Sequence, residues 1–513
     1  MNFQRSSGVL LHPTSLPGQY GSGDLGATAY HFIEWLVVAG QKLWQMLPLG
    51  PVGMGDSPYM CLSAFAGEPM LIDLQELVDR GWLPKSELEH LPSFDQHKVL
   101  YNDVKNFRMS KLRIAAKQFF AKNTKKEMDD FQTFCKTQRA WLEDYALFMS
   151  IIQKYNGAEW SSWDADLVKR EPAAMKKIRK ELADEINFWE FTQWCFFRQW
   201  FALKKYANDR GIQIVGDIPI FIAYQSADVW ANPHLFHLDK NMRPKVVAGV
   251  PPDYFSVTGQ RWGNPLYDWK AMHEENYAWF IQRIKTTLEL VDIVRIDHFR
   301  GFAGYWEIPA TEATAVKGRW VKGPGAKLFD AIEKKLGKMP IIAEDLGEIT
   351  PDVVELRDRY NFPGMRILQF AFAADTKNNF LPHNYISNTV VYSGTHDNDT
   401  TIGWFASATE REREFVKKYA ATNGKEIHWD FIRLASQSVA DMAVFPLQDI
   451  LGLGNDARMN LPGHAVGNWA WRFVWDQVQP WHALKLYEIT ALTNRTSTDR
   501  LNLPAYPAGK VQP

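Results

Sequence analysis

The chain has 513 residues, of which 46% are hydrophobic and 23% are charged. This composition is that of a globular protein with room for one large barrel with insertions or for several domains. The net charge of −1 excludes the strong basic field of a nucleic-acid-binding or membrane-surface protein, so we expect neither kind of partner.

The cysteines and the first residues favour a reducing compartment. Cys61, Cys135 and Cys195 are widely spaced and form no CxxC metal pattern. Residues 1–5 are not followed by the long apolar stretch of a signal peptide, and no apolar run approaches the length of a membrane span. We therefore expect a soluble, cytoplasmic protein that is a monomer or a small homo-oligomer.

Short apolar runs, most of them rich in Val, Ile, Leu or Met, alternate with stretches of helical periodicity. Such runs are typical of buried parallel strands, and eight strand–helix repeats predict an α/β protein with a (β/α)8 TIM barrel. Pro48 and Pro309 interrupt or close the second and fifth runs, which are the least typical of strands. The predicted strands are 8–12, 42–48, 213–221, 291–299, 304–308, 340–346, 365–372 and 389–395.

Two long stretches do not fit the barrel repeat. Residues 84–200 show apolar side chains at helical intervals and are too long for a simple loop, so they predict an inserted helical subdomain. Residues 232–269 alternate Gly, Pro and aromatics, which predicts a loop-rich insertion that covers the carboxyl-end face as a lid. The predicted division is 1–83 (barrel, first part), 84–200 (helical subdomain), 201–231 (barrel), 232–269 (lid) and 270–513 (barrel remainder and C-terminal helices).

Three of the predicted strands carry an acidic residue near or just beyond their carboxyl end: Asp297, Glu344 and Asp397. The carboxyl ends of parallel barrel strands meet at one face, so these three carboxylates should converge. Converging carboxylates at such a face are the equipment for breaking a glycosidic bond.

Strand alternation places Arg295 and Asp297 on the same side of their strand. A neighbouring guanidinium favours the ionised carboxylate and lowers its pKa, as a nucleophile requires, although a purely structural ion pair is the alternative. Glu344 ends an apolar run and lies near an ionised carboxylate, so its pKa should rise and it should act as the general acid and later as the base.

Further acidic and basic side chains leave some roles open. Asp397 should hydrogen-bond sugar hydroxyls and help to hold a distorted ring. Asp217 is a fourth inward acid that either orients Arg295 or a strand end or takes part in catalysis. An acidic barrel mouth with His298 and His396 nearby could instead hold a metal ion, as in enolase-like barrels. Because a guanidinium rather than another ligand lies beside the first acid, we expect no metal and no cofactor.

These residues resemble the α-amylase superfamily of barrels, and more closely the 4-α-glucanotransferases known as amylomaltases or disproportionating enzymes. The resemblance spans nearly the whole chain without departures at the motif positions, and residues 84–200 match least well. This family lacks the C-terminal β-sandwich domain of many amylases, so none is expected here. The matching segments are 55–59, 255–256, 259–265, 295–301, 343–347, 363–365, 394–401, 460–463 and 467–469.

The resemblance implies a retaining transfer of α-1,4-glucan segments between maltooligosaccharides. It implies that Asp297 is the nucleophile, Glu344 the acid/base and Asp397 the transition-state stabiliser, with the loop 251–265 arching over the cleft. The implied substrate-binding residues are Ser57, Tyr59, Asp217, Asp253, Tyr254, Trp262, Arg295, His298, His396 and Asn468.

Two other functions are compatible with parts of this pattern. An α-1,4-glucan hydrolase would use the same acids with water as the acceptor. A non-catalytic glucan-binding protein would keep the aromatics but should lack one of the three acids, and all three are present. Transfer must outcompete hydrolysis, and Tyr254, Phe255 and Trp262 are candidates for a lid that excludes water and stacks an acceptor sugar.

Overall fold

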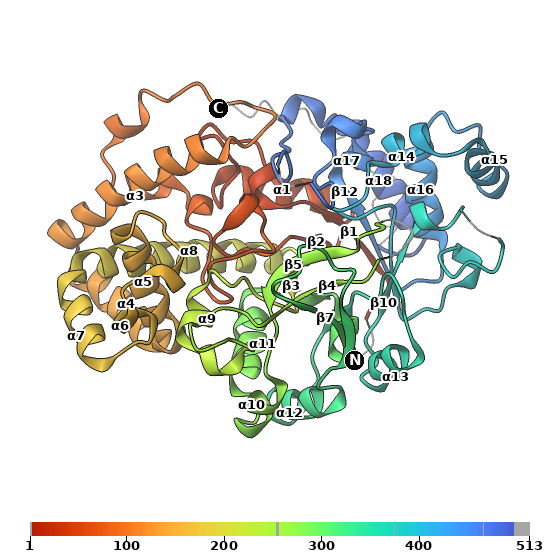
Figure 1. Ribbon diagram of the computed structural model, residues 1–513. Helices are drawn as coiled ribbons and strands as arrows, with labels where there is room; N and C mark the ends of the chain where they lie inside the picture. The colour runs from red at the N-terminus through yellow and green to blue at the C-terminus, as the bar shows by residue number, and fades with distance from the viewer. Residues whose placement is uncertain (1–2, 253–255, 374, 465, 497–513) are drawn as a thin grey trace.

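The computed structural model describes residues 3–252, 256–373, 375–464 and 466–496 (Figure 1). Eight parallel strands form one sheet in the order β10-β11-β12-β1-β2-β3-β6-β9. The two end strands also approach each other, because the backbone N–H of Ala343 donates to the carbonyl of Pro363 at 2.9 Å. The strands are β1 (Ser6–Leu10), β2 (Leu43–Gln45), β3 (Gln213–Pro219), β6 (Ile293–Asp297), β9 (Ile341–Ala343), β10 (Gly364–Ile367), β11 (Thr389–Tyr392) and β12 (Met442–Pro446).

Helices surround this barrel, which confirms the predicted (β/α)8 fold class. Strands β1, β2, β9, β11 and β12 are buried along their whole length, as expected for parallel strands that are covered by helices. Neighbouring helices of the outer ring contact each other, for example α18 with α1, α1 with α8, α8 with α11 and α11 with α12. The ring contains α1 (Ala27–Val38), α8 (Ala183–Asp209), α11 (Ala278–Leu290), α12 (Ala326–Leu336), α13 (Pro351–Arg359), α14 (Thr401–Ser407), α16 (Ile427–Gln437) and α18 (Pro480–Leu492), with the shorter or peripheral α2 (Leu74–Asp79), α9 (Ala227–Ala231), α10 (Trp269–Glu274), α15 (Glu410–Tyr419) and α17 (Leu447–Ile450).

The prediction of the fifth barrel strand was wrong. Residues 304–308 belong to β7 (Gly304–Pro309), which pairs antiparallel with β4 and β8 outside the barrel. The missing barrel strand is β12, which lies between β11 and β1. Both segments are short apolar runs that end in proline, so local sequence does not decide which of them joins the barrel. As a result, the three acids follow the fourth, fifth and seventh barrel strands, whereas the predicted set of strands places them on the fourth, sixth and eighth.

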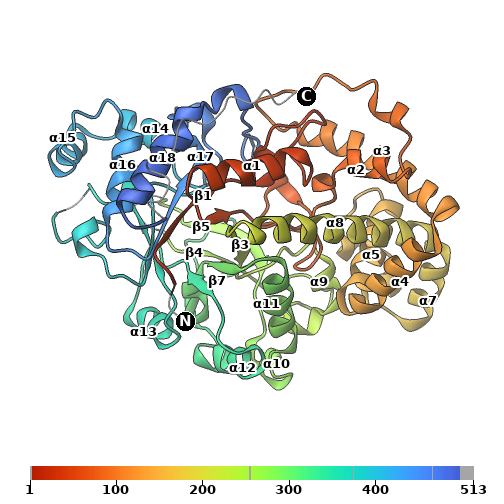
Figure 2. The same cartoon turned by 180° about the vertical axis from the view of Figure 1, so that it is seen from behind.

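A group of helices lies to one side of the barrel, at the left of Figure 1 and at the right of Figure 2. Its aromatic rings pack edge-on and tilted around Phe119, whose ring centroid lies 5.1 Å from that of Trp82 and 5.0 Å from that of Trp194. Helix α8 runs from this group back to the barrel, so the predicted boundary at residue 200 falls inside one continuous helix. The division into domains stays a prediction. The other helices here are α3 (Tyr101–Lys122), α4 (Lys125–Thr137), α5 (Arg139–Lys154), α6 (Ala165–Val168) and α7 (Pro172–Glu181).

The second insertion contains more regular structure than its composition predicted. Strands β4 (Val246–Val250) and β5 (Gln260–Pro265) pair antiparallel, and with β7 and β8 (Arg319–Lys322) they form a four-stranded sheet. A register shift between Val247 and Gly249 bends this hairpin. A side chain at position 249 would place its Cβ 2.2 Å from the carbonyl oxygen of Gln260, so glycine permits the close approach. Asp253, Tyr254 and Phe255 lie outside the described residues.

Long apolar helices are absent from the part of the chain that the structure describes: none of its helices could cross a membrane.

Candidate active site

The three predicted acids lie at the carboxyl ends of barrel strands. Asp297 is the last residue of β6, Glu344 directly follows β9, and Asp397 lies in the turn after β11. Asp297 interacts electrostatically with Asp397, and Glu344 with Asp297. The three carboxyl groups therefore share one site at the mouth of the barrel.

A buried guanidinium, that of Arg295, joins Asp297 to the fourth acid, Asp217. Arg295 Nη1 lies 2.6 Å from Asp217 Oδ2, and Arg295 Nη2 lies 3.0 Å from Asp297 Oδ1. The hydroxyl of Tyr59 donates to the same Asp217 oxygen at 2.8 Å. This network fixes the guanidinium beside Asp297, which is the contact expected if Asp217 orients Arg295.

The predicted pKa shift of Asp297 was wrong in direction. Burial raises the pKa of Asp297 to about 6, and the charge of Arg295 is the largest opposing influence. Strand alternation predicts that a guanidinium lies beside Asp297, but it does not predict how far burial removes water from the carboxylate, and this loss of water raises the pKa. The side chain still exposes 30% of its surface, and a carboxyl group with this pKa remains mainly ionised at pH 7.

Glu344 shows the expected rise in a more enclosed position. Burial and then the charge of Asp297 raise the pKa of Glu344 to about 8. The backbone N–H groups of His298 and Leu346 donate to its two oxygens at 2.6 and 2.7 Å and oppose the rise. His298 has φ 55° and ψ 48°, an uncommon left-handed conformation for a residue other than glycine, and it contributes one of these donors.

Asp397 is the most open of the three acids. Its side chain exposes 46% of its surface, and its Oδ1 lies 3.4 Å from His396 Nε2. The side-chain amide of Asn460 donates to the same oxygen at 2.6 Å. This contact was not predicted, although Asn460 opens a segment that matched the family pattern.

Aromatic rings line two sides of the site. The ring of Tyr59 stacks on His396 with 5.1 Å between centroids, and Trp469 lies 5.7 Å from Tyr59 and 5.9 Å from His396. Trp262 of β5 meets His298 edge-on at 4.8 Å. Flat rings beside carboxylates suit the C–H faces of sugars. Trp469 was not among the predicted binding residues, but it too lies in a matching segment.

The other predicted binding residues are placed less directly. Ser57 Oγ accepts from the backbone N–H of Tyr59 at 3.2 Å, so it shapes the loop that carries this ring. Asn468 accepts from the N–H of Leu461 at 2.9 Å and donates to the carbonyl of His464 at 2.8 Å, within its own loop. Asp253 and Tyr254 cannot be placed, because they lie outside the described residues.

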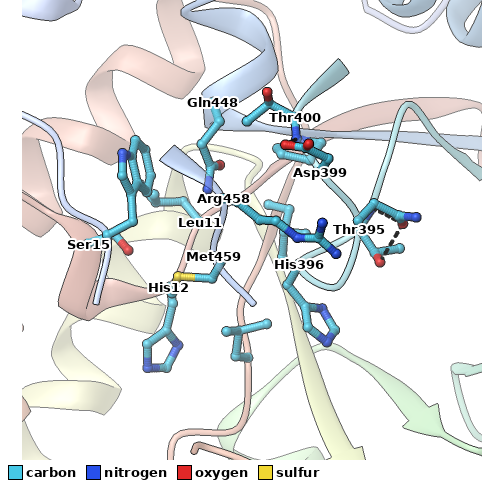
Figure 3. A pocket seen from close by; sticks show the side chains of 15 residues that line it. Leu11, His12, Ser15, Thr395, His396, Asp399, Thr400, Gln448, Arg458 and Met459 are labelled. Carbon is cyan, nitrogen blue, oxygen red and sulfur yellow. Dashed lines mark hydrogen bonds between the residues drawn. The ribbon is translucent and has the colours of Figure 1, made fainter. Parts of the chain in front are cut away.

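A pocket adjoins His396 at the ends of β1 and β12 and the turn after β11 (Figure 3). His12 and His396 both line it, and the Nδ1 atom of each ring is buried without a hydrogen-bond partner. Burial and then the nearby His396 lower the pKa of His12 to about 3, which keeps this ring neutral. Within the described ranges, no group of three or more His, Cys, Asp or Glu side chains is arranged to hold a metal ion.

The fold and the converging carboxylates define an enzyme that breaks and re-forms glycosidic bonds. The chain belongs to the 4-alpha-glucanotransferase family, whose model matches residues 11–476. It is 50% identical over 503 residues to the 4-alpha-glucanotransferase of Thermus thermophilus, covering 96% of this chain and 100% of that protein. It is 51% identical over 496 residues to that of Synechocystis sp. (strain ATCC 27184 / PCC 6803 / Kazusa), covering 96% and 98%.

A solved structure agrees with this assignment. The amylomaltase from Streptococcus agalactiae in complex with acarbose superposes with a TM-score of 0.93 at 40% identity, covering 96% of this chain and 100% of that one. The predicted resemblance and the predicted 4-α-glucanotransferase activity are thus confirmed, and the hydrolase alternative is not favoured.

Proposed function

We propose that this enzyme transfers α-1,4-glucan segments with retention, through a covalent glucosyl-enzyme on Asp297. The observation that carries the proposal is the placement of Asp297 and Glu344 at the carboxyl ends of the neighbouring strands β6 and β9, with Arg295 Nη2 3.0 Å from Asp297 Oδ1. Burial gives the two groups different pKa values, about 6 for Asp297 and about 8 for Glu344. Between these values one group is mainly a carboxylate and the other mainly an acid, which are the two forms that retaining cleavage requires.

The first half of the reaction uses both groups at once. A carboxylate oxygen of Asp297 attacks the anomeric carbon of the donor as the glycosidic C–O bond breaks. Glu344 gives its proton to the departing 4-oxygen, and the shortened glucan leaves. The product is a glucosyl ester on Asp297, and Glu344 is left as a carboxylate.

The second half reverses these roles. Esterification removes the negative charge of Asp297, so Glu344 can take the proton of an incoming 4-hydroxyl. The deprotonated oxygen attacks the anomeric carbon and Asp297 leaves as a carboxylate. Two inversions preserve the α configuration, and all bonds and protons balance without a cofactor.

The surrounding side chains support binding of the sugar at the cleavage point. Asp397 keeps an exposed carboxylate for sugar hydroxyls, and Tyr59, His396 and Trp469 present rings beside it. We place Trp262 at the acceptor side, where its ring beside His298 helps to exclude water. The acarbose that is bound to the Streptococcus agalactiae amylomaltase is the ligand with which we would probe the same face here.

The test is incubation of the purified enzyme with maltotriose alone, following product lengths and total reducing ends together. Glucose and longer maltooligosaccharides at constant reducing ends are expected, because each transfer breaks one glycosidic bond and forms another. Rising reducing ends with only shorter products would show hydrolysis instead. Unchanged maltotriose would contradict both.

The remaining expectations concern the setting of the enzyme. We propose a cytoplasmic enzyme, consistent with Cys61, Cys135 and Cys195 being free thiols. A monomer or a small homo-oligomer stays a prediction that light scattering of the purified protein would test.

A further inference from the structure

Asp397 is held by a segment far away in the sequence, residues 458–460. Asn460 donates its side-chain amide to Asp397 Oδ1 at 2.6 Å. Its backbone N–H donates to the carbonyl of His396 at 3.0 Å. One residue thus binds both the carboxyl group of Asp397 and the peptide unit before it.

Arg458 strengthens the same attachment. Its Nη2 donates to the backbone carbonyl of Asp397 at 2.6 Å, and its Nε donates to the carbonyl of Asn460 at 2.8 Å. Figure 3 shows this side chain reaching toward the turn that carries Thr395 and His396. The guanidinium therefore ties the turn to residues 458–460 with a planar pair of donors.

Within its own turn, Asp397 donates its backbone N–H to Thr395 Oγ1 at 3.3 Å, but the hydrogen bond to its carboxyl group comes from Asn460. Asp397 lies beyond the end of β11, so no ladder hydrogen bonds of the barrel fix it. The side chain of Asp397 exposes 46% of its surface. Asn460 occupies Oδ1, and among the described residues no hydrogen bond reaches Oδ2. This arrangement leaves one defined oxygen to meet a sugar hydroxyl.

The geometry points to Asn460 as a positioning residue for Asp397, with Arg458 holding the peptide backbone. This inference rests on the role of Asp397 proposed above. A carboxylate that must bind a distorted sugar ring in the transition state gains from a fixed position, since a misplacement of about 1 Å can cost about 10²-fold in rate. Asn460 supplies that position without touching the reacting atoms.

The loop that carries Asn460 is anchored independently of Asp397. The backbone N–H of Trp469 donates to the carbonyl of Met459 at 2.7 Å. The hydroxyl of Tyr101, from the first turn of α3, donates to the carbonyl of Trp469 at 2.9 Å. These contacts hold both ends of the loop, so loss of one amide group at position 460 should leave the loop in place.

The experiment compares Asn460→Ala with the matched control Asn455→Ala. Asn455 also donates its amide to a carboxylate, Asp399 Oδ2 at 2.8 Å, but not to Asp397. We expect kcat for maltotriose to fall about 10- to 100-fold in Asn460→Ala, with KM changed far less, and kcat to be unchanged in Asn455→Ala. Full kcat in Asn460→Ala would overturn the proposal.

A double variant separates positioning from a general structural defect. If Asn460 acts through Asp397, then adding Asn460→Ala to Asp397→Asn should cause no further loss of kcat. Losses that multiply would show an independent structural effect and overturn the proposal. Full turnover in Asp397→Asn alone would instead contradict the proposed role of Asp397.

Asn460→Asp keeps the size and shape of the side chain, so it is the variant to test if Asn460→Ala folds poorly. It replaces the amide donor with a second carboxylate beside Asp397, so activity at neutral pH should fall. Below neutral pH a proton held between the two carboxyl groups would restore the hydrogen bond. The pH optimum should therefore move toward acid, and an unmoved optimum with full activity would contradict the inference.

Discussion

Glu344 and Asp297 occupy one site but hold their protons with different strength. Burial raises the pKa of both groups, and the charge of Asp297 raises that of Glu344 further, to about 8 against about 6 for Asp297. The charge of Arg295 lowers the pKa of both groups. Two backbone N–H groups lower the pKa of Glu344 as well. This difference in pKa supports the proposed roles of Asp297 as the nucleophile and Glu344 as the acid.

The first prediction concerns the pH dependence of kcat/KM. Activity should rise with pH as Asp297 loses its proton near pH 6, because only the carboxylate attacks. It should fall as Glu344 loses its proton near pH 8, because the carboxylate cannot protonate the leaving oxygen. Because the two carboxyl groups interact, the rising and falling limbs of the pH profile report the titration of the pair and not of either residue alone. The measurement is the rate of maltotriose disproportionation from about pH 4 to about pH 10. A rate that stays constant above the pKa of Glu344 would contradict its role as the acid.

Replacement of the nucleophile is the second prediction. Asp297→Asn should lower kcat by about 10⁴-fold or more, because an amide cannot form the glucosyl ester, whereas glucan binding should persist. The matched control is Asp292→Asn at the opposite end of β6, where Asp292 accepts from Asn208 and from the N–H of Ile214. Turnover close to that of the parent enzyme in Asp297→Asn would remove Asp297 from this role.

The barrel and the acids could be predicted because both follow from local pattern. Continuous apolar runs identify buried parallel strands, and the residue at which a run stops lies at the mouth of the barrel. Pairing partners cannot be found in this way. Residues 304–308 and Met442–Pro446 look alike locally, yet the first lies in an antiparallel sheet and only the second in the barrel.

The contacts around the acids could not be predicted from the sequence for a similar reason. Asn460 and Asp397 are 63 positions apart, and only the course of the loop after α17 brings them together. The pKa of Asp297 was predicted from its neighbour Arg295, which alternation identifies. The depth of burial that decides the direction depends on loops from several other strands.

A third prediction tests the network below Asp297. Asp217 accepts from both Arg295 and Tyr59 through Oδ2, so the amide oxygen introduced by Asp217→Asn could still accept there. The negative charge of Asp217 raises the pKa of Asp297, and its removal should therefore move the acid limb of the pH profile to lower pH. The measurement is kcat/KM against pH for both proteins, and an acid limb that moves upward or stays would contradict the coupling.

The same change should destabilise the fold, because Arg295 is 3% exposed and would keep only one charged partner. Breaking a buried pair by removing one partner costs about 3–5 kcal/mol. The amide oxygen can keep the hydrogen bonds from Arg295 and Tyr59, so we expect a loss toward the lower end. Urea unfolding monitored by circular dichroism gives this value, and equal stability of the two proteins would contradict the structural importance of the pair.

The fourth prediction concerns the choice between transfer and hydrolysis. Trp262 lies on β5 with its ring edge-on to His298 and its Nε1 donating to Gln260 Oε1 at 3.1 Å. We expect Trp262→Ala to admit water and to remove a stacking surface for the acceptor, so that the ratio of hydrolysis to transfer rises. The ratio is measured with maltotriose as the increase in total reducing ends divided by the glucose that is released. Trp320→Ala is the control, since this ring lies on β8 against Arg300, with 3.9 Å from the guanidinium carbon to the ring centroid. An unchanged ratio in Trp262→Ala, or an equal rise in both variants, would show that this ring does not govern the fate of the glucosyl-enzyme.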